Sequence, residues 1–121
     1  MYKDVHLYYF SGTGNTKALA EAAAMFIRNE GSSVMLRDIA AGDGFGPVDL
    51  TGIFLPVYSL GAPRIVINFV QALPQGEGRA AFVIANAAGM AGTAHAAIAR
   101  ALTLKGYHVK FAEWVLSLIH I

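Results

Sequence analysis

Short apolar runs alternate with amphipathic stretches along the whole chain. The runs have the length and the β-branched or aromatic content of strands, and they cover residues 5–10, 33–39, 53–58, 80–85 and 107–116. Between them, apolar residues recur at helical spacing over residues 16–30, 63–73 and 94–105. This alternation predicts an α/β domain in which right-handed crossovers build an open parallel five-stranded sheet. The pattern alone does not settle the order of the strands.

Each predicted helix should bury one apolar stripe against the sheet. The stripes consist of Leu19, Ala22, Ala23, Phe26 and Ile27, of Ile65, Val66, Phe69, Val70 and Leu73, and of Ala94, Ala97, Ile98, Ala101 and Leu102. In the last strand, His108 and Lys110 alternate with Val109 and Phe111, which indicates an edge strand with one wet face. Trp114, further along the same strand, is expected to pack.

Two connections lack a helical pattern. Residues 40–49 contain three glycines and Pro47, so we expect a loop there, and no final helix follows the last strand. A doubly wound sheet needs helices on both faces, so some apolar sheet surface should remain bare. We therefore expect a domain over residues 1–116 and an atypical tail at 117–121. Either the gene product is truncated, or a second copy or a partner domain covers the bare patch.

Composition narrows the class of protein. The 121 residues suit one domain, and 55% hydrophobic against 14% charged residues favours a sheet covered on both faces. The net charge of +1 and the absence of a Lys/Arg cluster argue against nucleic-acid binding. No apolar run reaches the roughly 20 residues that span a bilayer, and no signal peptide is recognisable, so a cytoplasmic protein is expected. The chain has no cysteine, which excludes disulfides, thiolate metal sites and an Fe–S cluster of its own.

The densest cluster of hydrogen-bond donors lies between the first strand and the first helix. It consists of Ser11, Gly12, Thr13, Gly14, Asn15 and Thr16. The glycines let the backbone turn tightly and bring N–H groups up to an anion, while hydroxyl and amide side chains add further donors. The helix that follows contributes the positive end of its dipole. This turn therefore predicts a phosphate site.

Other phosphate motifs fit less well. The glycines are two residues apart and no Gly-Lys-Ser/Thr follows, which excludes the P-loop pattern. The dinucleotide pattern G-x-G-x-x-G matches at Gly12 and Gly14 but has Lys17 at its third glycine. Asp38, at the end of the second strand, could hold a ribose and keeps the dinucleotide alternative open. The four histidines have no metal-ligand spacing, although His95 could lie near a ligand at the start of the third helix.

These residues resemble those of a known family. Residues 9–16 resemble the phosphate loop of the flavodoxin-like FMN-binding family, residues 56–63 look like its P-x-Y-x-x-x-x-P loop, and residues 86–89 add a weaker match. The combination is similar to the flavodoxin domain of proteins that join such a domain to a ferredoxin-type Fe–S domain. The resemblance covers about residues 4–116, and it implies the strand order 2-1-3-4-5 and a final helix for which this chain shows no pattern.

The resemblance also implies roles for individual residues. Residues 11–16 would hold the FMN phosphate. The isoalloxazine ring would be bordered by Pro56, Val57, Tyr58, Ser59, Leu60 and Gly61 on one side and by Asn86, Ala87, Gly89 and Met90 on the other. Tyr58 could stack on the ring, and Gly61 could bring a backbone group near the flavin N5 atom. No catalytic side chain and no metal ligand is implied.

The function expected from this resemblance is electron transfer through bound FMN, in which the chemistry belongs to the cofactor. Three alternatives remain open: an FMN-dependent quinone reductase or oxidase, a non-redox module that binds a dinucleotide or another phosphate ligand, and a fragment too incomplete to hold FMN. The expected partner is a redox protein or an Fe–S domain outside this chain. Because the net charge of +1 provides no acidic steering field, a short-range or tethered partner is favoured over a diffusing one.

Overall fold

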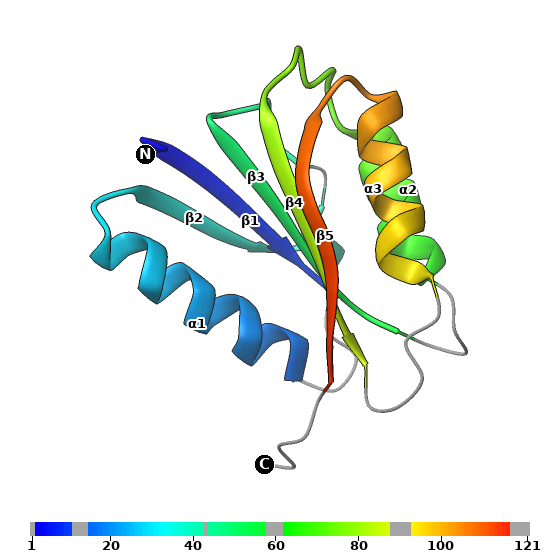
Figure 1. The fold of residues 1–121 in the computed structure, drawn as a ribbon, viewed down its shortest axis with the longest axis horizontal. Coiled ribbons are helices and arrows are strands. Elements are labelled where there is room, and N and C mark those ends of the chain that lie inside the picture. Colours follow the sequence, from blue (N-terminus) through cyan, green and yellow to red (C-terminus); the bar gives the residue numbers. More distant parts are fainter. Residues whose placement is uncertain (1, 11–14, 43, 58–61, 88–92, 117–121) are drawn as a thin grey trace.

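The computed structural model describes residues 2–10, 15–42, 44–57, 62–87 and 93–116, which form an α/β fold (Figure 1). Its elements are β1 (Asp4–Tyr9), α1 (Asn15–Asn29), β2 (Ser33–Asp38), the 3-10 helix η1 (Ile39–Ala41), β3 (Leu50–Pro56), α2 (Arg64–Ala72), β4 (Ala80–Ala87), α3 (Ala94–Leu104) and β5 (His108–Leu116). The five strands pair in parallel in the order β2-β1-β3-β4-β5, which confirms both the predicted fold class and the strand order that the resemblance implies. None of the helices in the described ranges could cross a membrane.

The strand and helix positions agree with the sequence pattern except at their ends. The largest difference is β3, which begins at Leu50 because Thr51 and Gly52 pair with neighbours on both sides, so tertiary pairing overrides the low strand propensity of glycine. The expected ends of α1 and α3 are confirmed. Gly31 and Gly106 follow these helices with φ angles of 104° and 92°, a conformation that side chains other than glycine rarely adopt.

Helices cover the two faces of the sheet unequally. Figure 1 shows α2 and α3 side by side on one face and α1 on the other. The face under α2 and α3 carries the larger apolar cluster, which includes Tyr8, Ile53, Leu55, Phe69 and Ile98. The smaller cluster under α1 includes Val5, Leu7, Phe54 and Phe82. One face of the sheet is therefore covered by α1 alone, whereas the other face is covered by α2 and α3.

The predicted buried stripe of α1 is only partly correct. The helix buries Thr16, Ala20 and Ala24, whereas Ala22 is exposed and 67% of Phe26 is exposed. The small side chains of Ala20 and Ala24 let the helix lie close to the sheet, and no second helix in the described residues covers Phe26. The stripes of α2 and α3 are confirmed except at Ile65 and Ala97, which are exposed.

β5 is an edge strand, as predicted, but a β-bulge interrupts the predicted alternation. Val109 pairs with Ala81 and Phe111 with Phe82, so Lys110 is an extra residue between two successive pairs. Val109 packs against the α2–α3 side, whereas the Phe111 ring stacks on Phe82 at 5.0 Å on the α1 side. Trp114, which we expected to pack, is 44% exposed.

The bare apolar surface expected from the sequence is present. A groove of about 310 Å³ lies between α1 and the strands β4 and β5, and its lining is almost entirely apolar. It includes the side chains of Phe26, Ile84 and Phe111. We call this surface the apolar groove. The tail at 117–121 lies outside the described residues, as does any contact it makes with the groove.

A loop takes the place of a helix after β2, as the glycines of residues 40–49 predicted. The phenol oxygen of Tyr8 accepts a hydrogen bond from the Phe45 backbone N–H at 3.0 Å and lies 3.3 Å from Nδ1 of His6. The Arg37 guanidinium stacks on the Phe45 ring, 4.7 Å from its centroid. Burial raises the pKa of the Tyr8 phenol, so this group stays protonated and can donate to His6. These contacts hold the loop against β1 and β2.

Gly52 occupies a place in β3 where no side chain fits. A Cβ atom there would lie 2.7 Å from Cδ2 of Leu7 and 2.7 Å from Cε2 of Phe82. We expect Gly52→Ala to lower the free energy of unfolding by about 1–3 kcal/mol because the packed ring and leucine must shift. Urea denaturation measures this loss. Gly46→Ala is the matched control, since a Cβ at Gly46 meets nothing within 4 Å, and an equal loss in both variants would contradict the explanation.

The His6 imidazole makes stability depend on pH. Burial lowers its pKa below the ordinary value of 6.5 and outweighs the attraction of Asp4, so the unfolded chain takes up this proton more readily than the folded one. The contribution of neutral His6 to the free energy of unfolding is therefore complete above pH 6.5, and it is lost as the pH falls through the lower pKa of His6 in the folded protein. We expect the urea midpoint to drop between about pH 7.5 and about pH 5.5, and to drop less in His6→Gln. Equal drops would show that other groups carry the effect.

Candidate functional site

The carboxyl ends of β1, β3 and β4 lie at one edge of the sheet, where all three α-helices begin (Figure 1). The backbone N–H of Phe10 donates to the carbonyl of Phe54 at 3.0 Å, and that of Val57 donates to the carbonyl of Asn86 at 3.1 Å. After β1 the chain passes to α1 on one face, and after β3 it passes to α2 on the opposite face. Such a divergence between adjacent parallel strands opens a crevice at the edge of the sheet, where α/β proteins bind their ligands.

The structure brings the described members of the predicted site to this edge. Asn15 and Thr16 are the first residues of α1, Pro56 ends β3 and is followed by Val57, and Asn86 pairs with Pro56 near the end of β4. Ala87 is the last residue of β4. The other predicted site residues, which lie outside the described residues, are Ser11, Gly12, Thr13, Gly14, Tyr58, Ser59, Leu60, Gly61, Gly89 and Met90.

Thr16 carries an unsatisfied polar group at the start of α1. Its side chain is 1% exposed, and its Oγ1 atom has no hydrogen-bond partner. A buried hydroxyl without a partner costs about 1–3 kcal/mol, so such groups are rare in folded proteins and call for an explanation. A ligand that accepts a hydrogen bond from Oγ1 would remove this cost.

The electrostatics of the same helix end favour an anion. The first turn of α1 contains no acidic side chain, so nothing in it offsets the positive end of the helix dipole. The first backbone N–H groups of a helix have no partner within the helix, and they point toward any group placed at its end. Lys17 is exposed, which agrees with a site built from neutral donors and the helix end.

Asp38, the residue for which the sequence left a dinucleotide ligand as an alternative, has a structural role. Its Oδ1 atom accepts a hydrogen bond from the Ala40 backbone N–H at 2.8 Å and caps η1. Because this capping contact explains an acidic residue at the end of β2, the position of Asp38 no longer points to a ribose.

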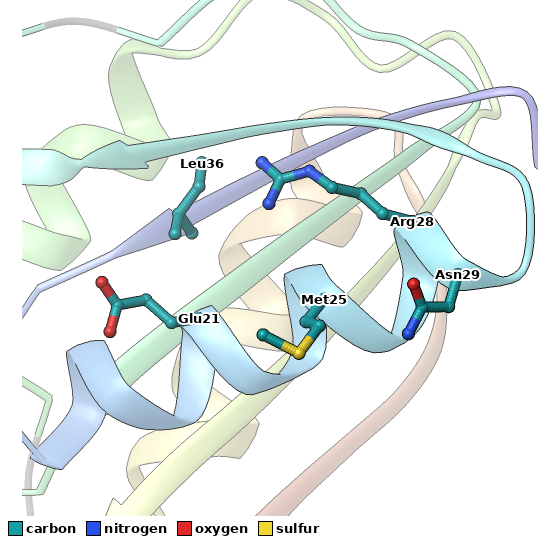
Figure 2. A pocket seen from close by; sticks show the side chains of 5 residues that line it. All are labelled: Glu21, Met25, Arg28, Asn29 and Leu36. Atoms are coloured by element: carbon teal, nitrogen blue, oxygen red, sulfur yellow. The ribbon is translucent and has the colours of Figure 1, made fainter.

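A second hollow lies along the outer side of α1. Figure 2 shows Glu21, Met25, Arg28 and Asn29 on α1 facing Leu36 on β2, around a groove of about 420 Å³. Arg28 donates to the Val34 carbonyl at 3.2 Å, so its guanidinium already has a partner. The groove is open, and none of the unsatisfied buried atoms belongs to its lining. In the described ranges, no group of three or more His, Asp or Glu side chains could hold a metal ion.

Comparison with solved structures identifies the fold. An archaeal flavodoxin superposes with a TM-score of 0.82 at 19% identity, over 94% of this chain and 83% of the flavodoxin. The rubredoxin:oxygen oxidoreductase of Desulfovibrio gigas contains the same fold, with a TM-score of 0.80 and 20% identity over 97% of this chain and 31% of that protein. A flavoprotein of Lactobacillus acidophilus in complex with FMN superposes with a TM-score of 0.65 at 18% identity, over 94% of this chain and 93% of the flavoprotein. No family model and no curated protein sequence matches the chain. The protein thus has the flavodoxin-like fold.

The Thr16 hydroxyl should lower the free energy of unfolding of the ligand-free protein. We expect Thr16→Val, which keeps the β-branched shape, to raise the free energy of unfolding by about 1 kcal/mol because it removes a buried group without a partner. Urea denaturation of the ligand-free protein measures the change. Thr103→Val on α3 is the control, since its exposed hydroxyl bonds to the Ala99 carbonyl and should matter little. A clear loss of stability in Thr16→Val would mean that Oγ1 has a partner within the chain.

Proposed function

We propose that this protein binds FMN across the carboxyl ends of β1, β3 and β4 and transfers electrons through it. The observation that carries the proposal is the buried Thr16 hydroxyl without a partner at the N-terminus of α1. This hydroxyl lies directly after the donor-rich residues 11–15, in the strand-to-helix position that phosphate sites occupy.

The donors of this turn fit a phosphate monoester. A phosphate offers three oxygens that accept hydrogen bonds and carries nearly two negative charges at neutral pH. In the proposed complex, the Thr16 hydroxyl and the backbone N–H groups of the first turn of α1 donate to these oxygens. The helix dipole favours the charge, so the exposed Lys17 is not needed as a counterion.

The remaining predicted residues would hold the flavin ring. Among the described ones, Pro56 ends β3 and Val57 follows it, while Asn86 and Ala87 end the neighbouring strand β4, at the edge where α1 begins. When bound, FMN supplies the capacity to take up and release electrons, and the chain has only to bind it, orient it and tune its potential. The archaeal neighbour is a flavodoxin, and the Lactobacillus acidophilus neighbour was solved in complex with FMN, which supports this ligand.

A redox partner completes the proposed function, and a tethered or short-range partner such as an Fe–S domain fits the net charge of +1. The Desulfovibrio gigas neighbour supports this arrangement, because the fold there makes up 31% of a larger protein. The apolar groove beside Phe26 and Phe111 remains a proposed surface for such a domain or for a second copy of the chain. The proposal keeps the cytoplasmic location expected from the sequence.

Titration of the protein with FMN tests the proposal. We expect the wild type to quench flavin fluorescence, and we expect Thr16→Val to weaken FMN binding about 10- to 150-fold, which corresponds to one hydrogen bond to a charged group. Thr103→Val should bind as the wild type does. Riboflavin, which lacks the phosphate, should bind equally to Thr16→Val and to the wild type.

Several outcomes would contradict the proposal. Absence of quenching by the wild type would remove FMN as the ligand. Equal FMN affinity in Thr16→Val and wild type would show that the phosphate does not bind at the start of α1. Rapid turnover of a quinone by the FMN-loaded protein, without reversible reduction by an electron-transfer protein, would favour the reductase alternative.

A further inference from the structure

We propose that His95 is a ligand-contacting residue that hydrogen-bonds to the flavin ring through its Nδ1 atom, at the opposite end of the ligand from the phosphate. This inference rests on the proposed function, since it names a further contact in the same site. It comes from a second unsatisfied buried atom, on a different helix from Thr16.

Within the described residues, the buried side-chain nitrogen and oxygen atoms without a hydrogen-bond partner are Thr16 Oγ1, Arg37 Nε and His95 Nδ1. The Arg37 guanidinium stacks on the Phe45 ring at 4.7 Å, a contact that compensates in part for burial. No such contact is found for the other two atoms in the described structure. Both belong to the first turn of a helix, and both helices begin at the carboxyl edge of the sheet.

His95 is the second residue of α3, and the helix fixes its position. Ala94 before it is 1% exposed, and Ile98 and Leu102 bury the same helix against the sheet. The imidazole itself is half-buried, and its Nδ1 atom is fully enclosed. An imidazole nitrogen enclosed without a partner costs free energy in the same way as the Thr16 hydroxyl does. A ligand group at the edge of the sheet would satisfy it.

The two unsatisfied atoms lie on helices that follow strands two positions apart in the sheet. α1 follows β1 and α3 follows β4, with β3 between these strands. Neighbouring strands are about 4.8 Å apart, so β1 and β4 are about 10 Å apart. The helices also lie on opposite faces of the sheet (Figure 1). A ligand that reaches both atoms must therefore be extended, with an anionic group at one end and a neutral hydrogen-bonding group at the other.

FMN has this shape and chemistry, because its ring carries carbonyl oxygens and nitrogens that accept or donate hydrogen bonds. A neutral imidazole also has one donor and one acceptor nitrogen, so Nδ1 can serve either kind of ring atom. The contact would depend on the ring and not on the phosphate. This separation gives the inference a test that a merely structural histidine would not pass.

The experiment compares FMN and riboflavin binding in four proteins: wild type, His95→Phe, His95→Asn and Thr16→Val. Phe keeps the size of a ring and removes the polar atoms, whereas the Asn amide places a polar atom where Nδ1 lies. We expect His95→Phe to lower the affinity for FMN and for riboflavin by the same factor, about two- to tenfold, which corresponds to the loss of one neutral hydrogen bond. His95→Asn should restore most of this loss. Thr16→Val should lower the affinity for FMN and leave the affinity for riboflavin unchanged.

Two further measurements sharpen the result. In the ligand-free protein, we expect His95→Phe to leave the urea midpoint unchanged or raise it, because Nδ1 has no partner to lose. In the double variant with Thr16→Val, the two losses in FMN affinity should multiply, as for sites that do not touch the same group.

Each alternative result overturns a defined part of the argument. If Thr16→Val weakens FMN but His95→Phe binds both flavins as the wild type does, the inference is wrong and the proposed function stands. A lower urea midpoint of ligand-free His95→Phe would show that Nδ1 has a partner within the chain. Loss of FMN but not riboflavin affinity in His95→Phe would place His95 at the phosphate. If the wild type binds neither flavin, the proposed function and this inference both fail.

Discussion

β1 pairs in parallel with β2 on one side and with β3 on the other, and the remaining structure depends on this double pairing. Parallel neighbours require crossover connections, so α1 must carry the chain from the end of β1 back to the start of β2. The chain leaves β3 toward the opposite face. This divergence leaves a crevice between the ends of β1 and β3, and Thr16 lies in the first turn of α1 at that edge of the sheet.

Coverage of the two faces follows from the same connectivity. With α2 and α3 on one face and α1 on the other, aromatic side chains that a second helix would cover lie at the surface beside α1. α1 packs mainly against β1, β2 and β3, so part of β4 and β5 stays uncovered on this face. The apolar groove thus results from the position of the helix that covers this face.

The sequence predicted the parts of the fold that depend on local periodicity. In the described part of the chain it located every strand and α-helix and the loop after β2, since each has its own pattern or its own glycines. It could not reveal the bulge at Lys110 or the exposure of Phe26, because both depend on packing between distant segments. For the site, the sequence predicted which residue types lie at the edge, whereas the unsatisfied Thr16 and His95 atoms depend on how distant segments enclose them and are visible only in the three-dimensional structure.

The bulge in β5 also bears on how the protein behaves at high concentration. β5 is a nine-residue strand at one end of the sheet, with Trp114 and Val115 exposed near its end. A long, regular strand in this position presents free N–H and C=O groups on which another chain can pair and start an aggregate. The extra residue at Lys110 interrupts the regular spacing of these groups and adds a positive charge. The irregularity that misaligns Phe111 thereby also makes the strand a poorer template for aggregation.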